Sequence, residues 1–118
     1  MATLKPFASN PVPFGTVTVA AANTPVRLTS GFTDMAGEGF AEIRFVAVAG
    51  NTGANIYILS NSSAKDTTNF TNIILVIPKG NSDTIPKVAF LSNAIIASTL
   101  WVDADTSGDK VYLYGFQI

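Results

Sequence analysis

The segment 103–109, with the sequence DADTSGD, holds the side chains best suited to chemistry. Oxygen-bearing side chains recur at every second position and a glycine stands sixth, which matches the first half of a calcium-binding loop. The twelfth position of such a loop carries a bidentate glutamate, and in this chain it is Tyr114. We therefore favour a hairpin loop whose carboxylates accept backbone hydrogen bonds and whose Gly108 takes positive φ. The alternative is a calcium site formed by Asp103, Asp105, Ser107 and Asp109.

Two of these carboxylates and the single tryptophan suggest sugar chemistry as a further alternative. Asp103 and Asp105 would lie about 7 Å apart on one face of an extended strand, within the range of paired glycosidase carboxylates. Such catalysis needs a cleft and a raised pKa on one partner, and the sequence indicates neither. Trp101 has the ring needed to stack on a sugar, but a lone tryptophan between apolar neighbours is more often a core or interface residue. We therefore expect no enzyme.

The composition of the chain excludes the most familiar active sites. Its 118 residues include no cysteine and no histidine, which removes disulfides, thiolate ligands and any Ser-His-Asp arrangement. The net charge of −1 offers no attraction for nucleic acid or an anionic membrane surface, and no apolar run is long enough to span a bilayer. We expect neither of these partners, and no cofactor beyond the calcium alternative.

The elements that position these residues are predicted to be strands. From Gly15 onward, short segments of period two are separated by turn residues. Seven to nine such strands are typical of an all-β antiparallel sandwich, and we expect a jelly-roll-like sandwich over residues 15–118. The turn residues at 50–53 predict a hairpin between the segments 40–49 and 54–60.

Residues 1–14 are expected to form an extended N-terminal arm. They hold three of the six prolines and show no regular period, which argues against a helix or a central strand. Such an arm either stays free in solvent or lies along a neighbouring subunit. In the second case Phe7, Pro11 and Phe14 would make the contacts.

Low charge and strands that are apolar on both faces predict an oligomer. Charged residues make up 13% of the chain, against about 25% in typical globular proteins. The strand 111–118 places Val111 and Leu113 on one face and three aromatic residues with Ile118 on the other, and the segment 54–60 is apolar on both faces too. Loops of the same chain could cover these faces, but we favour a second copy or another protein, because large exposed apolar patches are rare on monomers. The interface candidates in the sandwich are Tyr57, Trp101, Tyr112, Tyr114 and Phe116.

Three segments resemble a known family. They are NTGANIYI at 51–58, IPKG with TIP within 77–86, and LWVDADTSGDKV at 100–111. Together they resemble the small β-sandwich virion proteins of tailed bacteriophages over about residues 40–118. The resemblance implies a capsid decoration (cement) protein or a module of a fibre. This chain departs from the family pattern at Lys110, where a small residue usually follows the acidic turn, and its arm has no counterpart.

We therefore expect a structural protein of the phage virion that stabilises the head by binding capsid subunits. It would be made in the host cytoplasm and would lie on the capsid surface as a homo-oligomer on the major capsid protein. A trimer would suit the local threefold axes of a capsid. The alternative is a carbohydrate-binding module of a tail fibre or lectin-like protein, which would use Trp101 and the acidic loop.

Overall fold

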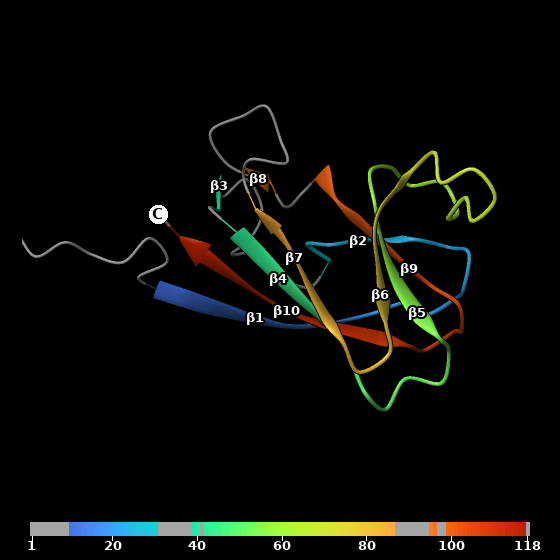
Figure 1. The fold of residues 1–118 in the computed structure, drawn as a ribbon, viewed down its shortest axis with the longest axis horizontal. Coiled ribbons are helices and arrows are strands. Elements are labelled where there is room, and N and C mark those ends of the chain that lie inside the picture. The colour runs from blue at the N-terminus through green and yellow to red at the C-terminus, as the bar shows by residue number, and fades with distance from the viewer. Residues whose placement is uncertain (1–9, 31–38, 41, 87–94, 97–98, 118) are drawn as a thin grey trace, which may run out of the picture.

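The computed structural model of the chain is built from β-strands (Figure 1). It describes residues 10–30, 39–40, 42–86, 95–96 and 99–117. No helix among these residues has the length and apolar character needed to cross a membrane. The described strands are β1 (Asn10–Thr18), β2 (Val26–Arg27), β3 (Gly39–Phe40), β4 (Glu42–Ala47), β5 (Asn55–Leu59), β6 (Ile73–Pro78), β7 (Ser82–Pro86), β8 (Ile95–Ile96), β9 (Trp101–Ala104) and β10 (Lys110–Gln117).

Within the described residues, eight strands form two four-stranded antiparallel sheets that share one core. Sheet A has the strand order β1-β10-β4-β7, and sheet B has the order β2-β9-β5-β6. The short strands β3 and β8 pair with each other as a separate ladder. These two layers are the antiparallel β-sandwich that the sequence predicts.

Strand pairs are nested inside one another along the chain. β1 pairs with β10, β2 with β9, β4 with β7 and β5 with β6, each time antiparallel. The outermost pairing joins Asn10 to Gln117, and the innermost joins Leu59 to Ile73. Each later strand therefore returns to pair with a progressively earlier one.

The core lies between the two sheets and follows from the period of two in the sequence. In β4, Ile43, Phe45 and Ala47 have no solvent exposure, while the residues between them are half-buried. Successive strand residues point to opposite faces, so this alternation buries one face of each strand. The remaining buried members of the core are Val17, Val19, Leu28, Ile56, Ile58, Ile77, Ile85, Leu100, Val102, Ala104, Val111 and Leu113.

Two turns that the sequence predicts as hairpins instead connect the two sheets. The turn at 50–53 leads from β4 in sheet A to β5 in sheet B, and the turn at 105–109 leads from β9 in sheet B to β10 in sheet A. Both hairpin predictions are wrong. Turn residues mark a reversal of chain direction, but they carry no information on which sheet receives the next strand.

The first strand begins earlier than the sequence predicts, because β1 starts at Asn10 and includes five residues assigned to the arm. β1 is an edge strand of sheet A, and prolines are tolerated at an edge because their missing N–H is not needed by a second neighbour. A bulge between Pro13 and Gly15, with Gly15 at φ 108°, breaks the register there. Phe14 packs against the core of its own chain, and Phe7 lies outside the described residues.

Candidate functional site

Tyr112 and Tyr114 lie on the outer face of sheet A. Successive strand residues point to opposite faces, and the alternating residues Val111 and Leu113 are buried in the core. Both tyrosines are half-buried, and their ring centroids are 5.9 Å apart with an interplanar angle of 40°. Such a tilted pair offers a broad, rigid aromatic surface with two polar hydroxyls. It is the candidate contact surface that the sequence predicts for this strand.

The neighbours of this pair come from β4. Val46 lies opposite Tyr112 in the ladder, and Arg44 lies opposite Tyr114. The guanidinium of Arg44 sits 5.9 Å from the Tyr114 ring centroid, and its Nη2 lies 3.5 Å from Glu42 Oε2. We call the surface formed by Glu42, Arg44, Val46, Tyr112 and Tyr114 the tyrosine face.

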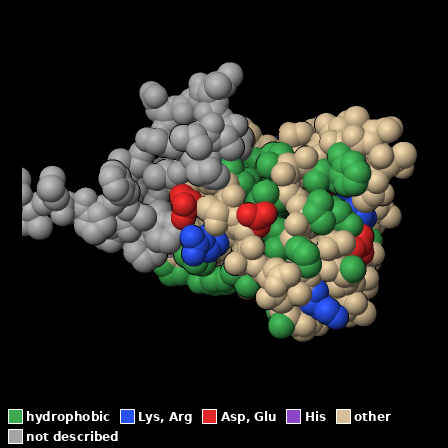
Figure 2. Space-filling model, viewed as in Figure 1, with side chains coloured by type: hydrophobic (Ala, Val, Ile, Leu, Met, Phe, Trp, Pro, Cys, Tyr) green, Lys and Arg blue, Asp and Glu red, His purple; other side chains and the backbone are tan. Residues whose placement is uncertain are grey.

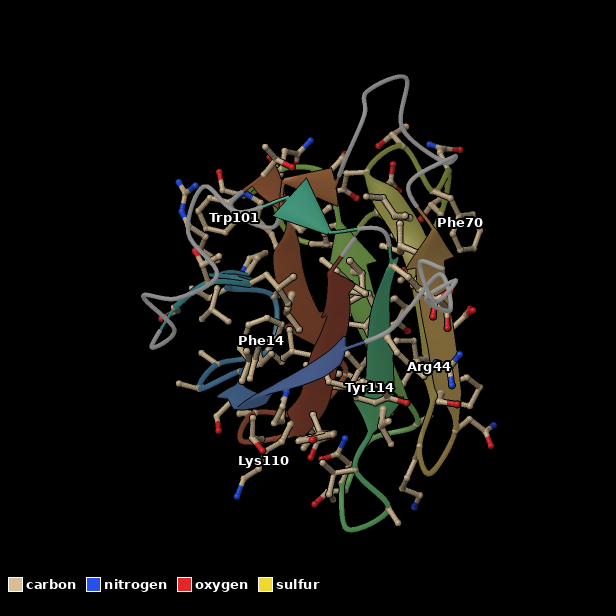
Figure 3. The ribbon with its side chains drawn as sticks, turned by 90° about the vertical axis from the view of Figure 1, so that its left-hand side faces the viewer. Phe14, Arg44, Phe70, Trp101, Lys110 and Tyr114 are labelled. Atoms are coloured by element: carbon tan, nitrogen blue, oxygen red, sulfur yellow. The ribbon has the colours of Figure 1, made fainter. Side chains whose placement is uncertain are left out.

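The charges of the tyrosine face are balanced within the face itself. Arg44 Nε donates to Thr84 Oγ1 over 3.1 Å, and Arg44 Nη1 lies 3.4 Å from the Tyr114 hydroxyl (Figure 3). This partly exposed ion pair contributes little to stability, but it fixes the position of the Arg44 side chain. Pro11 and Phe116 are ladder partners further along β1 and β10, and their side chains lie outside what the structure describes.

Tyr57 lies on the outer face of sheet B and is covered by its own chain. Only 6% of the residue is exposed, and its hydroxyl donates to Asp105 Oδ1 over 2.9 Å. The Lys65 ammonium sits 5.4 Å from the ring centroid. Burial, together with the nearby carboxylates, raises the pKa of Tyr57 above its ordinary value. The sequence predicts that Tyr57 is an interface residue, but in the structure segments of the same chain cover it.

The segment that covers Tyr57 is the connection 60–72 between β5 and β6, which we call the cover loop. Its anchor is Lys65, whose side chain is 8% exposed. The Lys65 amide donates to Asp103 Oδ2 over 3.0 Å, and its Nζ donates to Ala104 O over 2.9 Å. Nothing in the sequence distinguished this lysine from an ordinary surface residue in a polar loop.

The four oxygen-bearing residues predicted as a calcium site accept hydrogen bonds from other segments of the chain. Asp103, with no solvent exposure, accepts from the Asn23 amide over 2.9 Å as well as from Lys65. Ser107 Oγ accepts from the Ala22 amide over 3.0 Å. Within the described residues, no group of three or more acidic side chains is placed to hold a metal ion. The arrangement fastens loops rather than surrounding a cation.

The remaining two carboxylates fasten the turn 50–53 and the start of β5. Asp109 accepts from the amides of Thr52 and Gly53 over 2.8 and 2.7 Å, and Asp105 accepts from the Asn55 amide over 3.1 Å. Gly108 has φ 89°, as predicted for this segment. The prediction that carboxylates accept backbone hydrogen bonds is therefore confirmed, although the turn joins two sheets. Because Asp103 has no exposure, it has no access to a glycosidic bond.

Trp101 is half-buried on the outer face of sheet B, where Arg27 of β2 lies opposite it in the ladder. The Arg27 guanidinium carbon stands 4.6 Å from the centroid of the indole ring. A cation at this distance occupies one face of the ring. Trp101 and the tyrosine face therefore belong to different sheets, and the structure does not bring these predicted contact residues together.

A depression of about 250 Å³ lies between the turns 50–52 and 107–110. Asn51 lies in its wall, where its Nδ2 donates to Lys110 O and its Oδ1 accepts from Lys110 N, both over 2.8 Å. Asp109, in the same wall, accepts from the two amides described above. These polar groups already have partners, so the depression offers a ligand fewer directed hydrogen bonds than its composition suggests.

Comparison with models of known protein families, with curated proteins and with solved structures finds no match to this chain.

Proposed function

We propose that this chain is a non-enzymatic structural protein of a phage virion, a decoration or cement protein that binds capsid subunits as a homo-oligomer. The observation that carries the proposal is the tyrosine face, because it presents half-buried aromatic rings on the outside of a rigid sheet. Tyrosine and arginine are enriched at protein interfaces, and both occur here beside an aliphatic residue. The low charge of the chain and the resemblance of residues 40–118 to phage virion proteins also support this proposal.

We further propose that the sandwich is a jelly roll. The nested pairs β1·β10, β2·β9, β4·β7 and β5·β6 support this proposal, because folding one long antiparallel ribbon over itself produces such an order. Jelly rolls occur in viral capsid proteins and in lectins, so the fold is compatible with both functions considered for this chain. The function must therefore be argued from its surfaces.

The proposed mechanism is attachment by many repeated contacts. Burial of Tyr112, Tyr114 and Val46 against a neighbour would remove apolar area from water, at roughly 25 cal/mol for each Å². Simultaneous binding of the copies of one oligomer would multiply the affinity of a single contact. A trimer would match the local threefold axes of a shell, and the virion surface would be its location.

The experiment that tests this proposal measures oligomeric state and shell binding together. We expect sedimentation velocity at micromolar concentration to show a trimer, and a variant carrying both Tyr112→Ser and Tyr114→Ser to sediment as a monomer. Binding to purified capsids of a phage that encodes this chain should fall by at least about tenfold in the same variant. The control is Ala49→Ser, at an exposed turn position outside the tyrosine face. A wild-type monomer that does not bind capsids contradicts the proposal.

A second candidate function is carbohydrate binding, which the polar depression favours. Its wall combines Val48 with hydroxyl and amide side chains, a lining that suits the mixed surface of a sugar. The Arg27 cation over Trp101 weighs against that ring as a stacking platform. A glycan array with and without calcium separates the two functions, since sugar binding lost on Thr52→Val, a change in the wall of the depression, would favour the second.

A further inference from the structure

The ammonium of Lys65 is turned into the molecule instead of toward solvent. Its side chain is 8% exposed, and Nζ donates to Asn23 Oδ1 over 2.8 Å and to Ala104 O over 2.9 Å. Charged side chains are sparse on the surface that Figure 2 shows, and an enclosed lysine is unusual in any protein. Asp103 already supplies the counter-charge, so the contact with Asn23 is not needed to pair the ammonium.

Asn23 is held in place by its backbone. Its amide donates to Asp103 Oδ1 over 2.9 Å, and its φ of 67° lies in the left-handed region, which asparagine tolerates better than most residues. The preceding amide, of Ala22, donates to Ser107 Oγ. Figure 1 shows this connection between β1 and β2 at the same end of the sandwich as the cover loop. The fold therefore brings Asn23 and Lys65 together, although 42 positions separate them in the sequence.

Asp103 lies beside both groups and has no solvent exposure. Its Oδ2 stands 3.9 Å from Lys65 Nζ, while its Oδ1 accepts from the Asn23 amide. The ring of Tyr57, a residue that is 6% exposed, has its centroid 5.4 Å from Nζ and keeps water from that side. A carboxylate in such a site is placed to take a proton from the amine. An amine, a carboxamide and a carboxylate are therefore adjacent in a largely dry environment.

We infer that Lys65 and Asn23 join covalently, through an isopeptide bond between Nζ and Cγ. Asp103 takes one proton from the ammonium, and the neutral amine attacks Cγ of Asn23. The tetrahedral intermediate breaks its bond from Cγ to Nδ2, and this nitrogen takes a second proton from Nζ and leaves as ammonia. Ammonia then recovers the proton held by Asp103. One ammonium and one carboxamide thus become one secondary amide and one ammonium ion, with no oxidant or cofactor.

Proximity supplies the rate that free amides and amines lack. Reactants fixed in the correct geometry reach effective concentrations of about 10⁵–10⁸ M. The hydrogen bond from Nζ to the Asn23 carbonyl is the arrangement before reaction, so the attack needs only a small movement of the lysine. Asn23 is itself exposed, so ammonia escapes to solvent and its dilution drives the reaction forward.

The bond fastens the cover loop to the connection between β1 and β2. The chain has no cysteine, and a crosslink between these distant positions restricts the unfolded chain in the way that a disulfide does. The covering of Tyr57 then no longer depends on hydrogen bonds and an ion pair alone. This inference does not rest on the proposed function.

The mass of the intact, purified chain tests the inference. We expect the folded protein to weigh one ammonia less than its sequence requires, and tryptic digestion to yield a branched peptide that joins Lys65 to Asn23. Lys65→Arg keeps the positive charge but removes the nucleophilic amine, so it should have the full mass. Asp103→Asn should keep the full mass over the time in which the wild type loses ammonia. The matched control is Lys79→Arg, at an exposed lysine, which should still lose ammonia.

Three results would overturn the inference. The first is a wild-type chain that is folded by circular dichroism and keeps its full mass. The second is a loss of ammonia that persists in Lys65→Arg, which would indicate a cyclic imide at an asparagine. The third is a loss of water instead of ammonia, which would assign the bond to Asp103. These masses are independent of oligomers and capsids, so failure of this inference is distinct from failure of the proposed function.

Discussion

Tyr57 on sheet B and Tyr112 on sheet A occupy equivalent places, since each lies on the outer face of a central strand whose alternate residues are in the core. Tyr57 is 6% exposed beneath the cover loop, whereas Tyr112 remains half-buried beside Tyr114. The same pattern of apolar residues on both faces thus describes two different surfaces. A strand that is apolar on both sides predicts a cover, but a loop of the same chain supplies that cover as readily as a partner does.

The largest expected effect comes from removing the anchor of the cover loop. Asp103→Ala leaves the Asn23 and Lys65 amides without their acceptor and a nearly buried ammonium without its counter-charge. We expect the free energy of unfolding to fall by about 3–5 kcal/mol, measured by urea denaturation. Asp83→Ala, at an exposed position of β7, is the control and should change stability by less than about 0.5 kcal/mol. Similar losses in the two variants would show that the cover loop does not depend on Asp103.

The direct comparison of the two sheets replaces the same residue type on each. Tyr57→Ala should cost about 3 kcal/mol, because it removes a buried ring and the donor to Asp105. Tyr112→Ala should cost about 1 kcal/mol, because the ring is already partly in water. Thermal unfolding of both variants under identical conditions gives the difference. Equal costs would mean that the outer faces of the two sheets are covered to the same degree.

A smaller effect is expected at the turn that the acidic residues fasten. A Cβ at Gly53 would lie 2.7 Å from Thr106 Oγ1 and 2.8 Å from Asp109 Oδ2, so Gly53→Ala must displace the carboxylate that holds its amide. We expect a loss of about 1–3 kcal/mol in urea denaturation. Gly50→Ala, where a Cβ meets nothing within 4 Å, should be neutral within about 1 kcal/mol. A neutral Gly53→Ala would show that Asp109 does not hold this turn.

The smallest effect is a pH dependence that belongs to sheet B alone. Because burial raises the pKa of Tyr57 in the folded chain, the unfolded chain loses this proton first as pH increases. Stability is therefore constant with respect to this group below about pH 10 and falls as pH rises above it. Urea denaturation between pH 8 and 11 should show a shallower decline for Tyr57→Phe than for the wild type. An identical decline would remove Tyr57 as its cause.

The sequence allowed the strands and their inward faces to be predicted, because side-chain alternation records burial residue by residue. The segment predicted at 54–60 corresponds to β5 within one residue at each boundary. The predicted role of Asp109 and its neighbours as acceptors of backbone hydrogen bonds also holds. These features depend on interactions between residues that are close in the sequence, so a local pattern of residue types predicts them.

The parts that could not be predicted depend on contacts between distant residues. Lys65 lies 38 positions from Asp103, and no local pattern indicates that its amide and side chain both reach that carboxylate. The assignment of β5 and β10 to opposite sheets also follows from long-range pairing. For the same reason, the sequence could not tell that Tyr57 is covered by its own chain.

The nested pairing of strands has a consequence for the way this chain reaches its native state. Asn10 meets Gln117 only after nearly the whole polypeptide has been arranged between them, whereas β5 and β6 are separated by one loop. Closing long loops before their contacts form is entropically costly, so we expect slow refolding, on the order of milliseconds to seconds. The innermost ribbon should gain protection from hydrogen exchange first, and the ladder that contains the tyrosine pair should gain it last.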